Sequence, residues 1–411
     1  MQQQKLIPHL FRTEYRKIVS VLCKRFGFDK IEIAEDIASD TFLTASESWG
    51  QKNIPSNPSG WLYNVAKNKA KNYFQRTNLF ENKISKELIH LVNNNEIEID
   101  LSPQNINDSQ LQMMFAICDS SISTEAQIGL SLRILCGFGI EEIADAFLTN
   151  KETIKKRLFR AKEKLREEKI KIELPNSSQI DERLTTVLRT IYLLFNEGYY
   201  SQSQNKTLRK ELCFEAIRLC YMLIENVETN KPTANALLSL MCFHASRFEA
   251  RMKNNNEPIL YDEQDTSLWD AELISKGIYF LNCAATGNKL SKYHLEAAIA
   301  YWHTHKADTK EKWENILQLY NQLLLIEYSP IAALNRIYAL SKTTSCADEK
   351  QKVIDEAEKL KLTDNHFYFV LLGELYKGVD IKKSKLNFQT AFSLAKTDAD
   401  KQMISKKLTA F

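Results

Sequence analysis

The chain has 411 residues, of which 44% are hydrophobic, and its formal net charge is +3. This length suits two or three domains, and the hydrophobic content is sufficient for buried cores. The sequence has no run of about 18 apolar residues, and residues 1–10 lack the layout of a signal peptide, so we expect a cytosolic protein. The eight cysteines form no C-x-x-C pair, so we expect small buried thiols and not disulfides or zinc ligands.

Glycine (11) and proline (8) are scarce, which predicts an all-α fold with short connections between helices. Residues 5–76 read as a first domain of three helices. Apolar residues at helical spacing over 11–26 predict a helix that ends at Gly27. Residues 31–49 predict a second, amphipathic helix, which has five acidic and no basic residues over 31–47.

The third predicted helix, residues 61–76, is basic and aromatic, with four cations and no acid. Its aromatic and basic residues are Trp61, Tyr63, Lys67, Lys69, Lys71, Tyr73, Phe74 and Arg76. Asn64, Asn68 and Asn72 recur every fourth residue and therefore share one face. Such a surface suits unpaired DNA, because cations hold the backbone, aromatic rings receive a base and amides read its edge. For Trp61 and Tyr73 we favour packing in the core, and for the Asn/Lys face we favour function.

Residues 77–110 are polar and rich in Asn, which predicts a linker. Residues 111–171 read as a second helical domain. Within it, a short apolar-faced helix ends before Leu148 and Thr149, which predict a tight turn. Asn150 or Thr149 then serves as the N-cap of the next helix.

That next helix is strongly basic: residues 151–171 hold seven Lys and three Arg against four Glu, a net charge of +6. Its predicted buried stripe is Ile154, Leu158, Ala161 and Leu165, and its off-stripe residues are Lys155, Lys156, Phe159 and Arg160. This is the pattern of a helix-turn-helix, whose second helix enters the major groove of DNA. A solvated basic helix without a DNA role is the alternative.

Residues 180–411 predict a long series of amphipathic helices, with loose similarity to paired-helix repeats over 313–340 and 367–396. Leu372, Gly373 and Tyr376 are placed as in a tetratricopeptide unit. Lys385 and Gln389, however, stand where that repeat expects a small and an aromatic residue.

Two motifs in this part carry open interpretations. Glu263, Asp265 and Asp270 suggest either a metal or carboxylate-pair site or helix caps beside a packed Trp269, and we favour the caps. Residues Asn196, Glu197, Gly198 and Tyr199 suggest either a helix stop with Gly198 as the left-handed cap or a regulatory contact with the DNA-reading half. No nucleophile elbow, phosphate loop or metal-ligand spacing occurs, so we expect no catalytic residue, metal or cofactor.

Together, these segments resemble regions two and four of extracytoplasmic-function (ECF) sigma factors, over residues 5–171. Residues 34–49 (AEDIASDTFLTASESW) resemble the helix that binds the clamp of the largest subunit of RNA polymerase. Residues 61–76 resemble the segment that opens the downstream promoter element, and residues 139–167 resemble the reader of the upstream element.

The resemblance implies a role for particular residues. Core polymerase is expected to bind Glu35, Asp36 and Asp40. The opened downstream element is expected at Asn68, Lys71 and Asn72, with Trp61 and Arg76 on the same segment. The upstream duplex is expected near Arg133, Lys155, Lys156, Phe159 and Arg160. The chain departs from the family at Gly139, where many members have a Ser cap, and at Leu148, where many have a turn Gly.

Residues 180–345 resemble the ECF subgroup with a fused, tetratricopeptide-like C-terminal domain. Glu263 and Thr266 stand where that subgroup has Asp and Arg, so any salt bridge built on that Arg is absent or replaced. The predicted partners are the RNA polymerase core, double- and single-stranded promoter DNA, and an unknown protein or ligand on the C-terminal domain.

We therefore predict a noncatalytic sigma factor, with a regulatory C-terminal domain over 180–411. One alternative is a helix-turn-helix regulator that does not act through polymerase, which needs no strand-opening face at 61–76. The other is a helical-repeat scaffold with a degenerate DNA-binding half, which needs no capped recognition helix.

Overall fold

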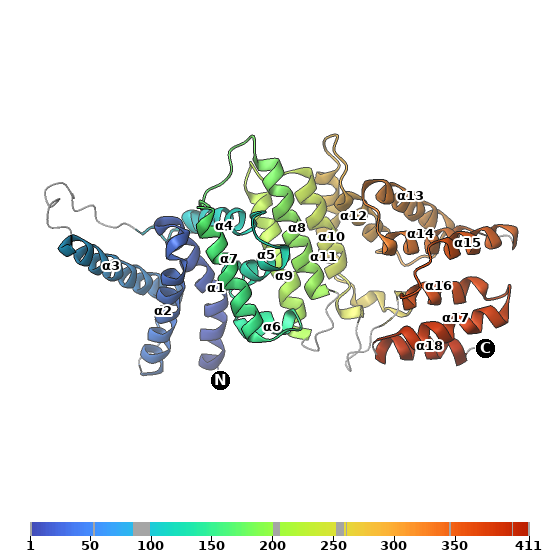
Figure 1. Cartoon of the computed structure of the whole chain (residues 1–411), viewed down its shortest axis with the longest axis horizontal. Helices are drawn as coiled ribbons and strands as arrows, with labels where there is room; N and C mark the ends of the chain where they lie inside the picture. The colour runs from blue at the N-terminus through green and yellow to red at the C-terminus, as the bar shows by residue number, and fades with distance from the viewer. Residues whose placement is uncertain are drawn as a thin grey trace. The chain divides into compact units, whose positions relative to one another are not determined.

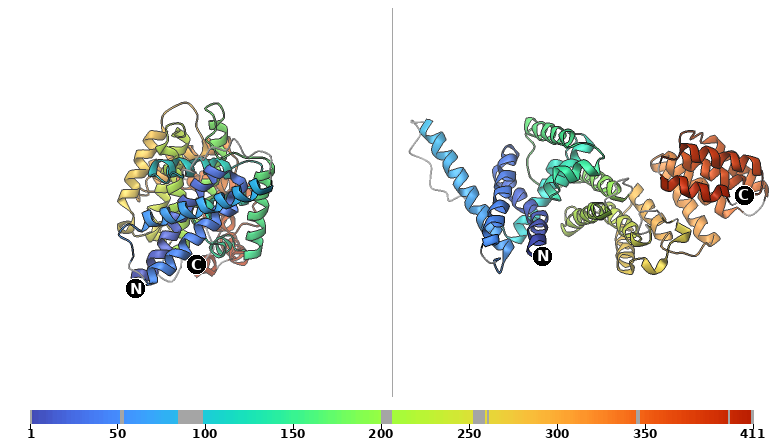
Figure 2. Two further views of the ribbon diagram at one scale, coloured as in Figure 1. Left: turned by 90° about the vertical axis from the view of Figure 1, so that its left-hand side faces the viewer. Right: turned by 90° about the horizontal axis from the view of Figure 1, so that it is seen from below.

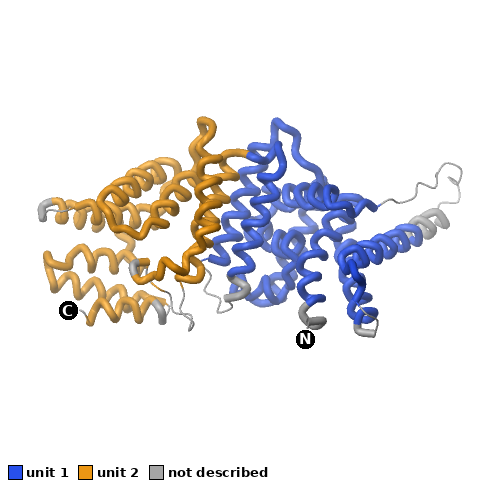
Figure 3. Tube along the Cα trace, turned by 180° about the vertical axis from the view of Figure 1, so that it is seen from behind, with its two compact units in different colours: residues 1–230 blue, residues 231–411 orange. Residues whose placement is uncertain are grey.

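The computed structural model describes residues 2–51, 54–84, 99–199, 206–251, 259, 261–344, 347–396 and 398–409. Within these residues the chain forms helices and short helical turns and no β-strand (Figure 1), so the prediction of an all-α fold is confirmed. The chain divides into two compact units, residues 1–230 and 231–411 (Figure 3). No helix of the described part has the length and apolar content that crossing a membrane requires.

Unit 1 begins with three long helices that the sequence marks clearly. α1 (Gln2–Phe26) ends at Gly27, which has a positive φ of 86°. After η1 (Phe28–Lys30), α2 (Ile31–Gln51) runs through the acidic segment. α3 (Pro58–Ile84) starts where the Asn57 side chain accepts a bond from the backbone N–H of Gly60 (2.9 Å). α3 extends past α2 in Figure 1 and in the right-hand view of Figure 2. Its first half is packed, because Leu62, Ala66 and Ala70 are fully buried.

The middle of unit 1 holds the helix-turn-helix. Its elements are α4 (Pro103–Ile117), α5 (Thr124–Leu130), the π-helical turn η2 (Ser131–Leu135), α6 (Ile140–Ala146) and α7 (Lys151–Glu167). The helices flanking the predicted linker reach into it, because α3 continues to Ile84 and α4 starts at Pro103 behind the N-cap Ser102. Residues 85–98 of that linker lie outside the described residues.

Two further helices, α8 (Ile180–Tyr199) and α9 (Lys206–Glu225), complete unit 1. α8 is bound to the helix-turn-helix part by buried polar contacts. Arg183 donates to the carbonyl of Phe115 (2.7 Å), and the Thr190 hydroxyl donates to the Gln127 side chain (2.9 Å). The compact unit therefore extends past residue 171 and includes the first two helices of the C-terminal segment.

Unit 2 is a series of helices, with three short 3-10 turns between the first two of them. It consists of α10 (Pro232–Ala245), η3 (Glu249–Arg251), η4 (Tyr261–Glu263), η5 (Thr266–Leu268), α11 (Ala271–Ala284), α12 (Lys292–Trp302), α13 (Lys310–Ile326), α14 (Pro330–Thr343), α15 (Ala347–Lys359), α16 (His366–Tyr376), α17 (Ile381–Leu394) and α18 (Asp398–Thr409).

The contact between α16 and α17 explains the mismatch in the repeat-like pattern. A Cβ on Gly373 would come within 2.8 Å of the buried Phe388 ring, and the Ser384 hydroxyl donates to the Gly373 carbonyl (2.7 Å). The small and aromatic residues of the pattern are thus Ser384 and Phe388, whereas Lys385 and Gln389 are exposed. The sequence interpretation placed these two positions one residue too late.

The described cysteines are free thiols, as predicted. Six of them are buried, and Cys283 is partly exposed. Burial raises the pKa of the Cys118 thiol to about 11 and that of Cys136 to about 12, so both remain protonated and unreactive at neutral pH. Cys346 lies outside the described residues.

Unit 2 contains a buried cluster of basic and aromatic groups around Tyr261. The His303 ring lies 5.3 Å from the Tyr261 ring and 5.9 Å from the Trp313 ring, measured between centroids. Burial, with the nearby charges of Arg247 and Lys312, lowers the pKa of His303 to about 3. Burial also lowers the pKa of His244 well below its ordinary value, with Arg247 adding to the shift. Both rings are therefore neutral in the folded unit.

Acid is expected to destabilise unit 2. The pKa of His303 is lower in the folded than in the unfolded chain, so the unfolded chain takes up a proton first as the pH falls below about 6.5. His303 alone is then expected to remove about 2 kcal/mol from the free energy of unfolding between pH 7 and pH 5, and His244 adds in the same direction. Urea unfolding at the two pH values measures this loss. The variant His303→Gln is expected to show a smaller one, and an unchanged pH dependence in that variant would contradict the assignment.

Candidate nucleic-acid interface

Helix α7, the second helix of the helix-turn-helix, has the two faces that its sequence predicted. Asn150 is the N-cap, because its side chain accepts a bond from the backbone N–H of Thr153 (2.8 Å). The buried stripe is Ile154, Leu158, Ala161 and Leu165, each less than 5% exposed. On the other side, Lys155, Lys156, Phe159 and Arg160 are exposed, and Phe159 is 62% exposed.

The turn before α7 forms a tight helix stop. The N–H of Thr149 bonds to the Ala144 carbonyl (2.9 Å), and the N–H of Leu148 bonds to that of Asp145 (3.1 Å). Leu148 between them has a φ of 48°, the left-handed conformation that favours glycine. Leu148 is 62% exposed, so its side chain contributes little packing to offset this strain. The predicted turn is confirmed, and the departure from a turn glycine has a conformational cost.

The variant Leu148→Gly is expected to stabilise unit 1 by about 1 kcal/mol, because glycine adopts a positive φ without the Cβ clash. Urea unfolding followed by far-UV circular dichroism measures the change. Leu148→Ala is the matched control, since it shortens the same side chain but keeps Cβ and the strain. Equal stability of the Gly and Ala variants would contradict a backbone origin.

Gly139 is the second position at which the chain departs from the family, and here another side chain supplies the missing cap. α6 begins with the Glu142 carboxylate accepting a bond from the Gly139 backbone N–H (2.8 Å). This contact satisfies an end group of the helix without a serine side chain.

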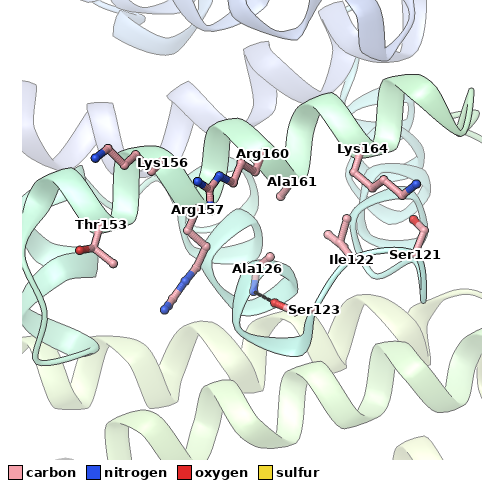
Figure 4. A pocket seen from close by; sticks show the side chains of 10 residues that line it. All are labelled: Ser121, Ile122, Ser123, Ala126, Thr153, Lys156, Arg157, Arg160, Ala161 and Lys164. Carbon is pink, nitrogen blue, oxygen red and sulfur yellow. Dashed lines mark hydrogen bonds between the residues drawn. The ribbon is translucent and has the colours of Figure 1, made fainter.

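A groove of about 470 Å³ runs between α7 and the start of α5 (Figure 4). Its lining residues are Ser121, Ile122, Ser123, Ala126, Thr153, Lys156, Arg157, Arg160, Ala161 and Lys164. Four of them are cations and none is acidic, so the groove attracts anions. The exposed face of α7 and this groove form one continuous basic surface, since Lys156 and Arg160 belong to both.

The face of α3 proposed for unpaired DNA is accessible. Asn64, Asn68 and Asn72 are exposed one turn apart along the helix. Arg76 is exposed beyond them, and Lys71 is partly exposed. The described part of α3 thus presents amides and cations side by side on a projecting helix.

The aromatic residues of α3 divide between packing and exposure. The Trp61 ring is half-buried and contacts the Trp49 ring edge-on, with centroids 5.3 Å apart. Phe74 stacks on Phe26. Tyr73 is 36% exposed, so the expectation that it belongs to the core is wrong.

The acidic helix α2 carries its three predicted polymerase contacts on two different sides. Asp36 and Asp40 are exposed. The Glu35 side chain is only 13% exposed, because Arg133 (3.2 Å) and Lys162 both form ion pairs with it. Arg133 also donates to the Tyr15 hydroxyl (3.1 Å) and the Phe138 carbonyl (3.2 Å). The structure therefore separates Arg133 from the exposed face of α7 and joins it to Glu35.

Two acidic residues of the motif around Trp269 form helix caps. Asp270 is the N-cap of α11, accepting a bond from the Leu273 N–H (3.0 Å), and Asp265 caps η5 through the Ser267 N–H (2.9 Å). Trp269 packs beside Tyr261, with ring centroids 6.2 Å apart. The capping interpretation is confirmed for Asp265 and Asp270. Among the residues that the structure describes, no group of His, Cys, Asp or Glu side chains is arranged to hold a metal ion.

The interpretation of Gly198 as a left-handed cap is wrong. Residues Asn196, Glu197, Gly198 and Tyr199 form the last turn of α8, and Gly198 is not among the residues with positive φ. Gly198 and Tyr199 are buried, and burial raises the pKa of Glu197. A helix needs a left-handed residue only after its last turn, and α8 has not yet ended at this point.

Sequence reasoning missed the polar residues that join the helices of unit 1 to one another. Arg12 forms ion pairs with Glu142 and Glu211, and Arg16 forms one with Glu215 (2.6 Å). The available signal was a matched spacing, with two Arg four residues apart in α1 and two Glu four residues apart in α9. That signal does not identify partners almost 200 positions away.

Comparison with known proteins matches two parts of the chain to families. Residues 10–79 match Sigma-70 region 2, and residues 183–285 match a family of unknown function, DUF6596. The chain is 28% identical over 386 residues to an uncharacterized protein of Rhizobium meliloti (strain 1021), covering 93% of this chain and 90% of that protein. No solved structure matches. The match over α1 to α3 supports a sigma factor and implies binding to the RNA polymerase core and to promoter DNA.

Proposed function

We propose that this chain is a sigma factor of the ECF type whose helix-turn-helix reads the upstream promoter element and whose α3 holds the opened downstream element. The observation that carries the proposal is the presence of two exposed basic surfaces in unit 1. One, on α7, has the form suited to paired DNA, and the other, on α3, has the amides suited to an extruded base.

The α7 surface supports duplex binding through its charge and its shape. Lys156 and Arg160 are long and exposed, and no acidic side chain of the described residues forms an ion pair with either of them. The adjoining groove brings Arg157 and Lys164 to the same side. Cations in this arrangement contact phosphates and base edges of the major groove. Lys155 contributes less to DNA binding, because its Nζ is ion-paired with Glu152 Oε1 at 2.9 Å.

The α3 surface supports a role in strand opening. Unpairing a base costs a few kcal/mol, and hydrogen bonds from Asn68 and Asn72 to the extruded base offset this cost. Lys71 and Arg76 stand beside them as phosphate contacts. A helix-turn-helix regulator that does not act through polymerase needs no such surface, which favours the sigma-factor assignment.

The C-terminal helices are proposed to be a tetratricopeptide-like regulatory domain. The supporting feature is the α16–α17 pair. Gly373 allows the buried Phe388 ring to pack against the α16 backbone, and the Ser384 hydroxyl donates to the Gly373 carbonyl. The described residues of this domain form helices in pairs, an arrangement suited to binding a protein or peptide.

Run-off transcription with purified core polymerase tests the proposal. The full chain is expected to support promoter-dependent initiation, whereas core polymerase alone is not. A shortened chain should end at Asn230 and not near Lys171, because α8 packs on α4 and α5 through Arg183 and Thr190. Failure of the full chain to bind core polymerase would overturn the assignment in favour of a regulator or a scaffold.

A further inference from the structure

Two ion pairs with the same spacing connect the first helix of the chain with a helix near residue 215. Arg12 and Arg16 stand one turn apart on α1, and Glu211 and Glu215 stand one turn apart on α9. Arg16 meets Glu215 at 2.6 Å, and Arg12 pairs with Glu211. α1 lies in the Sigma-70 region 2 match and α9 in the match to the family of unknown function. The segment of unknown function thus binds the polymerase-binding part directly.

These pairs are placed where charge interactions are strong. The side chains of Arg16 and Glu215 are 8% and 16% exposed. Arg218 on the next turn of α9 also binds Glu215 (2.8 Å) and donates to the Leu135 carbonyl (2.7 Å). Burial would raise the pKa of Glu215, but Arg218 and Arg16 hold it below its ordinary value, so the carboxylate stays ionised. α9 is therefore connected to α1 and to the end of η2 at once.

A second set of ion pairs joins α2 to η2 and α7 within unit 1. Glu35 of α2 is bound by Arg133 of η2 and Lys162 of α7, and Glu32 is bound by Arg166 of α7. Glu35 was expected to face polymerase and Arg133 to face DNA. In the closed arrangement these two groups are partners of one another, so neither serves an external partner at the same time.

We propose that unit 1 is a closed, self-inhibited state of the sigma factor, in which α7 is ion-paired to α2, α9 is ion-paired to α1, and α9 acts as the clasp. The four clasp residues are Arg12, Arg16, Glu211 and Glu215. Release of the clasp lets α7 separate from α2 and frees Glu35 for polymerase and Arg133 for DNA. This inference rests on the function proposed above, and it assigns a regulatory task to α9.

The closed state lowers the apparent affinity for polymerase in proportion to the fraction of molecules that are open. Weakening the clasp is therefore expected to strengthen binding to core without any new contact. Screening by salt acts in the same direction at the Arg12–Glu211 pair, whose side chains are 25% and 40% exposed.

The test compares Glu211→Lys with Glu215→Lys in one chain against the control Glu182→Lys with Glu228→Lys. Both double variants change the net charge equally, and Glu182 and Glu228 are exposed residues of unit 1. Spin labels at Ser46 of α2 and Glu167 of α7, both exposed, report the distance between these helices. Cys283 and Cys346 are replaced by Ser in all chains so that only the introduced cysteines are labelled.

The clasp variant is expected to show a longer and broader distance distribution and about tenfold tighter binding to core polymerase, whereas the control resembles the wild type. If the lysine variant fails to fold, as circular dichroism would reveal, Glu211→Gln with Glu215→Gln removes the charge without repulsion and takes its place. An unchanged distance distribution, or a changed one with unchanged core affinity, would overturn the proposal. A chain that opens but never binds core in any variant would instead overturn the sigma-factor assignment.

Discussion

Replacing Lys156 and Arg160 together by alanine is expected to weaken binding to a duplex promoter fragment about 100-fold, because each hydrogen bond between a charged side chain and DNA contributes about 1.5 kcal/mol. Both side chains are exposed on α7 and line the basic groove. Removing two phosphate-neutralising cations is also expected to lower the slope of log K against log salt by about 1.8. Fluorescence anisotropy over a salt series measures both quantities.

The matched control for this variant is Lys382→Ala with Lys385→Ala in unit 2, two exposed cations of α17. It changes the net charge equally and is expected to leave the affinity and the slope close to wild type. If the α7 variant binds duplex DNA as tightly as this control at the same salt concentration, α7 is not the recognition helix.

Replacing Asn68 and Asn72 together by alanine is expected to reduce open-complex formation about 30-fold while leaving duplex binding intact. The two amides are exposed one turn apart on α3, and the loss of their bonds to an extruded base removes about 2 kcal/mol of stabilisation from the melted state only. Permanganate footprinting of the promoter in the presence of core polymerase measures the melted fraction.

Duplex binding serves as the internal control for this prediction, because α7 is untouched by the change. Anisotropy on a fragment that carries only the upstream element should give wild-type affinity. Wild-type permanganate reactivity in the Asn68/Asn72 variant would show that these residues of α3 have no role in opening the promoter. Reduced affinity for the upstream fragment would show that the variant is misfolded.

The clasp proposed above decides when Arg133 contributes to duplex binding. Arg133 is engaged with Glu35 and Tyr15 in the closed unit, so it adds to duplex affinity only after opening. Lys156 and Arg160 are exposed already and act in both states. The effect of Arg133→Ala on duplex binding is therefore expected to be larger in the clasp variant than in the wild type.

The sequence by itself determined the helices and the local structure of α7. Asn150 at the start of α7, the turn at Leu148 and Thr149, and the stripe from Ile154 to Leu165 are all properties of residues within a few positions of one another. Capping, turn geometry and helical periodicity act over this same short range, which is why such features are readable before any tertiary structure is known.

Only the tertiary structure decided which charged groups meet. Glu35 and Arg133 are 98 residues apart, and Arg12 and Glu211 are 199 apart. With 55 basic and 52 acidic residues in the chain, the sequence permits very many such pairings, and the packing of α1, α2, α7 and α9 selects a few. The same holds for the repeat-like pattern: Ser384 and Phe388 are its small and aromatic positions because they contact Gly373 on the facing helix α16. Spacing along a helix tells which residues share a face, but the neighbour that covers that face is chosen by the whole folded unit.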